Sequence, residues 1–323
     1  MTATISCLLS DASWGGGNRL RLVLSDTIFI GAMLLTSALI AGLGVGSMYG
    51  LLALGFHVTH AVSNTVNFAQ GSTMMLGAVL CFTFWVKLGW PLPVAVLFAL
   101  VLCAVWGAFV ERVAVRPFVQ RASNSWLMAT VALGIVLENV VLFTFGKDPR
   151  GMPVGVLTNT SLSFFGNQVQ LLQVLVPVIG LLIAAALHFY FRRSRHGMAL
   201  LAVVQNPDAA RLMGIDVGRV VAASFALSGF LAGVAGVLVA PLFTISSTMG
   251  TLFGIKAFAV AILGGIGSAW GVVIAGLIYG VAEALINAQF GSGFSQIATF
   301  ALVILALAIR PDGLFGRTEV KKV

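Results

Sequence analysis

The stretch PVAVLFALVLCAVWGAFVERVAV, Pro93–Val115, decides the fold class of this chain. It runs from Pro93 to Val110 without a charged side chain. An apolar helix of about 20 residues is long enough to cross the hydrocarbon layer of a membrane, which is roughly 30 Å thick. Because similar stretches recur along the sequence, we expect an all-α polytopic membrane protein.

Ten candidate membrane segments share this apolar character. They are Leu22–Gly42, Gly46–Val62, Gln70–Val86, Pro93–Val115, Ser125–Phe145, Leu171–Phe191, Val220–Phe243, Gly254–Ile266, Gly271–Ala288 and Ser295–Ile309. The first two meet at AGLGVG and could form one bent helix, while Gly254–Ile266 is short for a complete crossing. The sequence therefore predicts about eight to ten membrane segments.

The composition and the charge pattern support a membrane location. Hydrophobic residues make up 59% of the chain and charged residues only 9%, whereas about a quarter of the residues in soluble domains are charged. The net charge of +8 comes largely from three basic stretches, which the positive-inside rule places on the cytoplasmic side. They contain Arg112, Arg116 and Arg121; Arg192, Arg193, Arg195, Arg211 and Arg219; and Arg310, Arg317, Lys321 and Lys322. Since topology accounts for this charge, we expect no nucleic-acid partner.

The same pattern divides the chain into three parts. Residues 1–21 lack the basic start and the short apolar core of a signal peptide, so we interpret them as an N-terminal tail. Residues 22–310 form the membrane domain, with a cytoplasmic loop at residues 192–219, and residues 311–323 form a cytoplasmic tail. The weakly charged, polar segment from Phe145 to Gln170 suits the outer face.

Two stretches interrupt the helical pattern: SNTVNFAQGS, Ser63–Ser72, and ILGGIGSAWG, Ile262–Gly271. Paired, glycine-interrupted segments in two halves of a transporter predict discontinuous helices, an internal repeat and a substrate path. The alternative is that the glycines only allow close helix packing, and that the polar side chains only satisfy the broken backbone. The candidate substrate-pathway residues are Asn64, Asn67, Gln70, Gly71, Gly264, Gly265, Gly267 and Ser268.

The stretch VVQNPDAARLMGIDVGR, Val203–Arg219, predicts a short, water-exposed helix. Asn206 can cap the helix, Pro207 suits its first position, and Gly214 can end it in a left-handed turn. About two turns of helix are marginal in isolation, so the bundle or a partner protein must hold them. The alternative is a helix lying on the membrane surface. The candidate docking residues are Asn206, Asp208, Ala209, Ala210, Arg211, Leu212, Met213 and Gly214.

A few polar side chains fall inside predicted membrane segments. Glu138 lies mid-span, where an ionisable group is a functional candidate, the alternative being a carboxyl that is protonated or paired within the bundle. Lys256 and Glu283 flank the second interruption and could pair, although Lys256 could also reach an interface. His57 and His60 stand three residues apart with no nearby Cys or acidic cluster, so we expect no metal site.

Several motifs together resemble one transporter family. DAARLMG, Asp208–Gly214, resembles the EAA-xxx-G loop by which ABC importer permeases dock into their ATPases, with Asp208 in place of Glu. VNFAQG, ERVAVRP, RHGMAL, IKAFAVAILGGIGSAWGVVIAGLIYGVAEAL and RPDGLFGRTEVKKV complete the likeness over most of the chain beyond about Ala38. Together they resemble the branched-chain amino acid permease family, of the LivH type rather than the LivM type.

This resemblance implies a multi-pass permease subunit of an ATP-driven importer in the bacterial cytoplasmic (inner) membrane. It further implies a second LivM-like permease, two cytoplasmic ABC ATPases and an external solute-binding protein as partners. The chain has no G-x-x-x-x-G-K-[ST] loop. We therefore expect no enzymatic activity and no cofactor of its own, with ATP and magnesium bound by the partners.

Two residues depart from the family pattern. The usual NFAHGE is NFAQGS here, with Gln70 and Ser72 in place of His and Glu, which leaves the solute open. The resemblance extends to importers of urea, short amides and other small solutes, and alternating access is the expected mechanism. A secondary transporter would also use broken helices, but it would not need a docking helix of the Asp208–Gly214 type.

Overall fold

The computed structural model describes residues 16–121, 123–153, 161–164, 167–310 and 313–316. The α-helices in this part of the chain are α2 (Gly16–Ser63), α3 (Gln70–Phe82), α4 (Leu92–Val110), α5 (Arg116–Val119), α6 (Trp126–Phe145), α8 (Leu171–Arg193), α9 (Arg195–Gln205), α10 (Pro207–Leu212), α11 (Val217–Val239), α12 (Met249–Gly264), α13 (Ala269–Phe290) and α14 (Ser292–Ile309). Two π-helical turns, η1 (Thr83–Lys87) and η2 (Glu111–Val115), extend α3 and α4.

The structure confirms an all-α polytopic membrane protein. Within the described residues, six helices are long and apolar enough to cross a membrane, and the shorter apolar helices Met249–Gly264 and Gln296–Ile309 accompany them. The six are Leu35–Ser63 of α2, Leu92–Val119, and the helices α6, α8, α11 and α13. The segments expected at Leu22–Gly42 and Gly46–Val62 form one continuous helix, α2, because the glycines between them sit in unbroken helical backbone.

Glycine contacts bring the central helices unusually close together. A Cβ atom built on Gly280 of α13 would lie 2.3 Å from the Cα atom of Gly46 in α2. A Cβ atom on Gly229 of α11 would similarly lie 2.3 Å from the carbonyl oxygen of Cys103 in α4. Any larger side chain would force these backbones apart, so glycine at these positions allows close helix packing.

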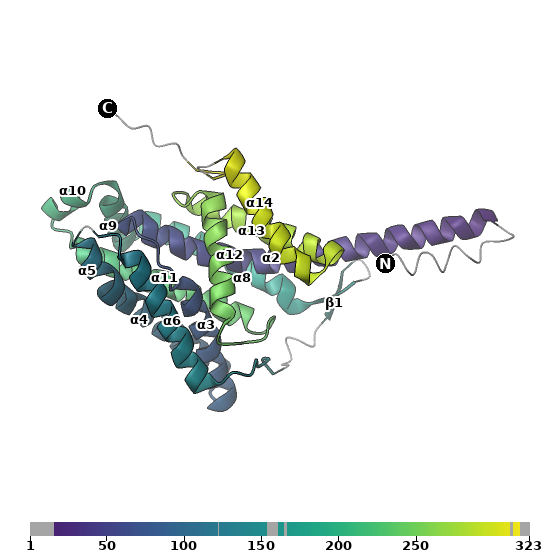
Figure 1. Ribbon diagram of the computed structural model, residues 1–323, viewed down its shortest axis with the longest axis horizontal. Coiled ribbons are helices and arrows are strands. Elements are labelled where there is room, and N and C mark those ends of the chain that lie inside the picture. The colour runs from purple at the N-terminus through teal and green to yellow at the C-terminus, as the bar shows by residue number, and fades with distance from the viewer. Residues whose placement is uncertain (1–15, 122, 154–160, 165–166, 311–312, 317–323) are drawn as a thin grey trace.

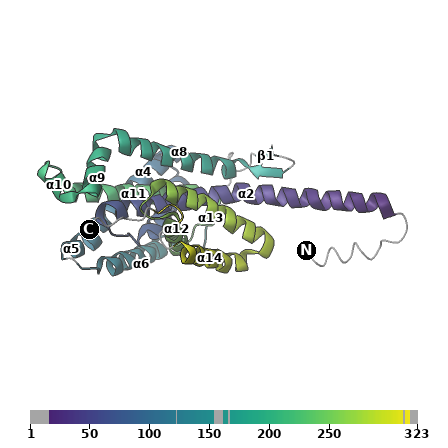
Figure 2. The same ribbon diagram turned by 90° about the horizontal axis from the view of Figure 1, so that it is seen from above.

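Figures 1 and 2 show α5, α9 and α10 together at one end of the bundle, away from the N-terminal half of α2. These elements carry several of the predicted cytoplasmic residues, including Arg116, Arg195 and Arg211. These basic residues, which are predicted to face the cytoplasm, therefore lie at one end of the molecule. Helix α11 starts near this end and packs against α2, α3 and α4 within the bundle.

The predicted outer segment contains a short hairpin. Strand β1 (Ser161–Phe164) pairs antiparallel with β2 (Asn167–Gln170), with Ser161 opposite Gln170. The backbone of Arg150 also bridges to Ile245, with N–O distances of 2.9 and 2.8 Å. The hairpin is an addition to the expected helices.

The predicted tails fall mostly outside the described residues, which exclude 1–15, 311–312 and 317–323. At the N-terminus, α2 begins at Gly16, so the helix includes the last residues of the predicted 1–21 tail. Near the C-terminus, the amide of Leu314 donates to the carbonyl of Leu263 at 2.7 Å, which holds this segment against the end of α12.

Candidate functional site

The first predicted interruption separates α2 from α3. Helix α2 ends at Ser63, and Asn64 follows in a left-handed conformation with φ of 52°. Asn67 is fully buried, and its Oδ1 accepts the amide of Ala69 at 3.1 Å, so this side chain satisfies the broken backbone just before α3. Its Nδ2 atom has no hydrogen-bond partner among the described residues.

Gln70 connects α3 to α11. Its side chain is fully buried, and its Nε2 donates to the carbonyl of Ser228 at 3.0 Å. The hydroxyl of Ser228 lies 2.8 Å from Gln70 Oε1 and 3.0 Å from the carbonyl of Gly55, so its one proton can be donated to either. Gln70 thus joins three helices, since Gly55 belongs to α2.

A cavity of about 290 Å³ lies where α3, α6 and α12 meet. Its wall is mostly apolar, with five polar or glycine positions from α3 and α12 and one carboxylate from α6. The lining residues are Phe56, Phe68, Gly71, Ser72, Val131, Gly134, Ile135, Glu138, Gly250, Thr251, Gly254, Ile255 and Phe258. Among the candidate pathway residues, Gly71 lines this cavity.

Glu138 places a carboxylate on the wall of this cavity. The hydroxyl of Ser72 donates to its Oε1 at 3.1 Å, and that of Thr251 donates to the same atom at 2.6 Å. The carboxylate of α6 therefore binds α3 and α12 at once. Both departures from the family motif thus contact another helix, because Ser72 meets Glu138 and Gln70 meets Ser228.

The second predicted interruption forms the junction between α12 and α13. Gly265 ends α12 with φ of 82°, and Ser268 caps α13 by accepting the amide of Gly271 at 3.2 Å. Gly264, Gly265, Gly267 and Ser268 do not belong to the cavity wall described above. The junction nevertheless contacts α2, since Nδ1 of His57 lies 2.6 Å from the carbonyl oxygen of Ile266.

Lys256 and Glu283 form the ion pair that the sequence left open. Lys256 belongs to α12 and Glu283 to α13, and only 16% and 17% of their side chains are exposed. Both residues line a second cavity of about 350 Å³, together with Tyr49. Helix α12 therefore separates two cavities, one containing Glu138 and the other containing this ion pair.

The predicted docking helix is α10. Asn206 caps it by accepting the amides of Asp208 and Ala209 at 3.0 Å each, and Gly214 ends it with φ of 82°. Arg211 pairs with Asp208 at 3.0 Å on the helix surface. Ala210 is buried against the neighbouring helices, with 3% exposure.

The tip of this short helix is apolar and open. Leu212 is 90% exposed and Met213 is 82% exposed. Figures 1 and 2 place α10 at the outermost edge of the basic end. An exposed apolar tip on a capped helix at a charged end is suited to insertion into a groove of another protein.

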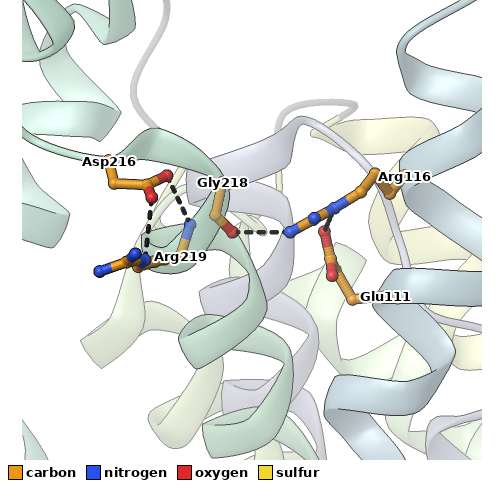
Figure 3. A network of polar contacts seen from close by, with 5 residues as sticks. All are labelled: Glu111, Arg116, Asp216, Gly218 and Arg219. Atoms are coloured by element: carbon orange, nitrogen blue, oxygen red, sulfur yellow. Dashed lines mark hydrogen bonds and ion pairs between the residues drawn. The ribbon is translucent and has the colours of Figure 1, made fainter.

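A polar network fixes the segment that follows α10 (Figure 3). Asp216 caps α11 through the amide of Arg219 at 3.1 Å and pairs with the Arg219 side chain at 3.0 Å. Arg116 donates to the carbonyl of Gly218 at 3.2 Å and pairs with Glu111 at 3.0 Å. Because Glu111 is only 3% exposed, the η2–α5 segment is held firmly against the start of α11.

Sequence reasoning missed part of the cavity. Gly250, Thr251 and Gly254 line it from α12, facing Gly71, and Ser228 holds Gln70 from α11. Each lies far along the chain from its partner, so no local pattern could have paired them. In the part of the chain that the structure describes, no three His, Cys, Asp or Glu residues are grouped to hold a metal ion.

Comparison with known proteins identifies the family. A family model described as branched-chain amino acid transport system, permease component, matches residues 38–309. The permease protein LivH of the high-affinity branched-chain amino acid transport system of Escherichia coli K12 is 34% identical over 299 residues, covering 87% of this chain and 96% of that protein.

Two further relatives agree with this match. BraD, the corresponding high-affinity permease protein of Pseudomonas aeruginosa, is 34% identical over 88% of this chain and 97% of its own length. A probable LivH permease of Methanocaldococcus jannaschii is also 34% identical, over 82% of this chain and 88% of its own length. With its apolar helices, the chain is a multi-pass inner-membrane protein and belongs to the family of branched-chain amino acid transport system permease components.

Proposed function

We propose that this chain is one of two permease subunits of an ATP-driven importer that carries branched-chain amino acids into the cell. Its partners in this proposal are a LivM-like permease, two cytoplasmic ABC ATPases and an external solute-binding protein. The relatives named LivH and BraD support the amino acid substrate, since the alignments cover most of both chains. The sequence contains no P-loop motif, which supports energy supply by partner ATPases.

The observation that carries this proposal is helix α10. Its backbone is fixed by Asn206 and Gly214, yet Leu212 and Met213 are left almost fully exposed. Large apolar side chains exposed in this way mark a protein contact when they lie outside the membrane. A docked ATPase would cover them at the predicted cytoplasmic end.

The contacts of α11 suggest how α10 drives transport. A push on α10 reaches α11 through the short connection at residues 213–216, and Arg116 clamps the start of α11 to η2 and α5. Further along α11, Ser228 holds Gln70 at the start of α3. Since Gly71 and Ser72 line the cavity, movement of α11 would shift the cavity wall and alternate its access between the two sides.

The proposal is tested by gentle purification of the chain from its native membrane, followed by reconstitution into liposomes. Mass spectrometry should identify an ABC ATPase and a second permease, and radiolabelled leucine should accumulate only with ATP and the loaded binding protein. A chain that purifies alone and transports leucine without ATP would instead be a secondary transporter. Uptake of urea or a short amide in place of leucine would show that the importer carries that solute and not branched-chain amino acids.

A further inference from the structure

The cavity between α3, α6 and α12 combines an apolar wall with a single charge. Among the described residues that line it, Glu138 is the one charged side chain, and Phe56, Phe68 and Phe258 supply much of the apolar surface. Its volume of about 290 Å³ lies just below the roughly 300–1,000 Å³ typical of ligand pockets. The space therefore suits a small solute with an apolar side chain.

The carboxylate of Glu138 lacks a basic partner. Within the described part of the chain, its polar contacts are the hydroxyls of Ser72 and Thr251, both of which donate to Oε1. Lys256, on the same helix as Thr251, is paired with Glu283 beside the other cavity. A charge inside a membrane protein normally pairs with an opposite charge, so this arrangement leaves a position for a cation in the cavity.

We propose that Glu138 binds the ammonium group of the transported amino acid while the aromatic wall holds its apolar side chain. This inference rests on the proposed function, because it assumes that the solute crosses through this chain. Ser72 and Thr251 act as positioning residues, since they hold one carboxylate oxygen and thereby fix the orientation of the other. The site selects for an ammonium group and against neutral amides of the same size.

The first test separates charge from hydrogen bonding. In the reconstituted importer, Glu138→Gln should reduce leucine uptake about tenfold or more, because the charge-assisted contact to the ammonium is lost. Stimulation of ATP hydrolysis by the binding protein should persist, since the docking helix is untouched. Asn139→Ala is the matched control, because Asn139 is exposed and bonds only locally to the carbonyl of Ile135 at 2.8 Å; its uptake should be unchanged.

The proximity of Ser72 allows the charge to be moved across the cavity. Adding Ser72→Glu to Glu138→Gln returns a carboxylate to the cavity from α3, at a residue whose native hydroxyl lies 3.1 Å from Glu138 Oε1. This double variant should recover much of the uptake, whereas Ser72→Gln with Glu138→Gln should not. Unchanged uptake in Glu138→Gln, equal recovery in both double variants, or failure of Glu138→Gln to assemble would each overturn the proposal.

A second test detects binding without transport. Cys81 and Cys103 are buried, so a cysteine at the cavity-lining position Ile135 provides a labelling site once Cys7 is replaced by Ser. Leucine and isoamylamine, which carry the ammonium, should protect Ile135→Cys from a maleimide in the assembled complex. 4-Methylpentanoate, which lacks it, should not, and neither should sodium chloride.

The outcomes of the two tests distinguish the inference from the function on which it rests. Protection should disappear in the Glu138→Gln background, and equal protection by 4-methylpentanoate would overturn the role of Glu138. If the native complex transports leucine but Glu138→Gln does so equally well, this inference fails and the importer function stands. If the native complex transports no leucine at all, the proposed function itself fails.

Discussion

Gln70 is fully buried, and its amide group both donates to and accepts from Ser228. The sequence shows only a polar residue at the end of an interruption, with substrate contact and local backbone satisfaction as the two alternatives. The structure gives it a third role, because the partner lies on α11, far along the chain. Residue types predict that a buried amide needs partners, but they do not reveal which helix supplies them.

Replacing Gln70 with Ala should destabilise the protein. The substitution removes the side-chain hydrogen bonds between Gln70 and Ser228 and opens space between α3 and α11, at a cost of about 1–3 kcal/mol. We expect a lower thermal unfolding midpoint for the purified complex. Thr144→Ala serves as the control because Thr144 is exposed and bonds only within α6; equal midpoints for the two variants would contradict this role.

The Lys256–Glu283 pair allows a second prediction from single residues. Lys256→Met should leave the largely buried Glu283 without its cation, and breaking such a pair typically costs about 3–5 kcal/mol. Lys256→Met combined with Glu283→Met removes both charges and should recover most of the loss. Thermal unfolding measures both variants, and a double variant no more stable than the single one would disprove this coupling.

At the scale of elements, the helix boundaries follow closely from local signals. Asn206, Pro207 and Gly214 predict α10 correctly, because capping and left-handed turns depend on neighbouring residues only. The apolar stretches likewise predict α6 and α13 to within a few residues. The continuity of α2 could not be predicted in this way, since glycine permits both a bend and a straight helix, and packing against α13 decides between them.

Gly214 provides a test of α10 as an element. A Cβ atom there would meet nothing within 4 Å, so a substitution acts through its φ of 82° rather than through a clash. Gly214→Val should disfavour this conformation by about 1–2 kcal/mol, misplace the tip and lower the leucine uptake per ATP hydrolysed. Gly214→Asn is the control, since Asn tolerates the left-handed region. Identical coupling in the two variants would exclude a need for this turn.

At the scale of the whole molecule, composition predicts a bundle of membrane helices and the charge pattern predicts one basic end. The structure contains the bundle and the basic end. The candidate substrate path is predicted only in part. Gly71 lines the cavity, whereas the facing residues Gly250 and Thr251 belong to α12 and precede the predicted stretch Gly254–Ile266. Meeting points between distant helices depend on the assembled bundle, so a single sequence supplies no direct signal for them.

The central claim, that α10 contacts an ABC ATPase, is tested most directly by photo-crosslinking in native membranes. A benzophenone amino acid placed at Met213 is compared with one at Phe143, since these side chains are 82% and 85% exposed. Phe143 lies near the end of α6 that leads to the predicted outer segment, so the two probes report opposite ends. The account predicts a crosslink to the ATPase from Met213 and none from Phe143. No ATPase crosslink from Met213, or equal crosslinks from both positions, would contradict it.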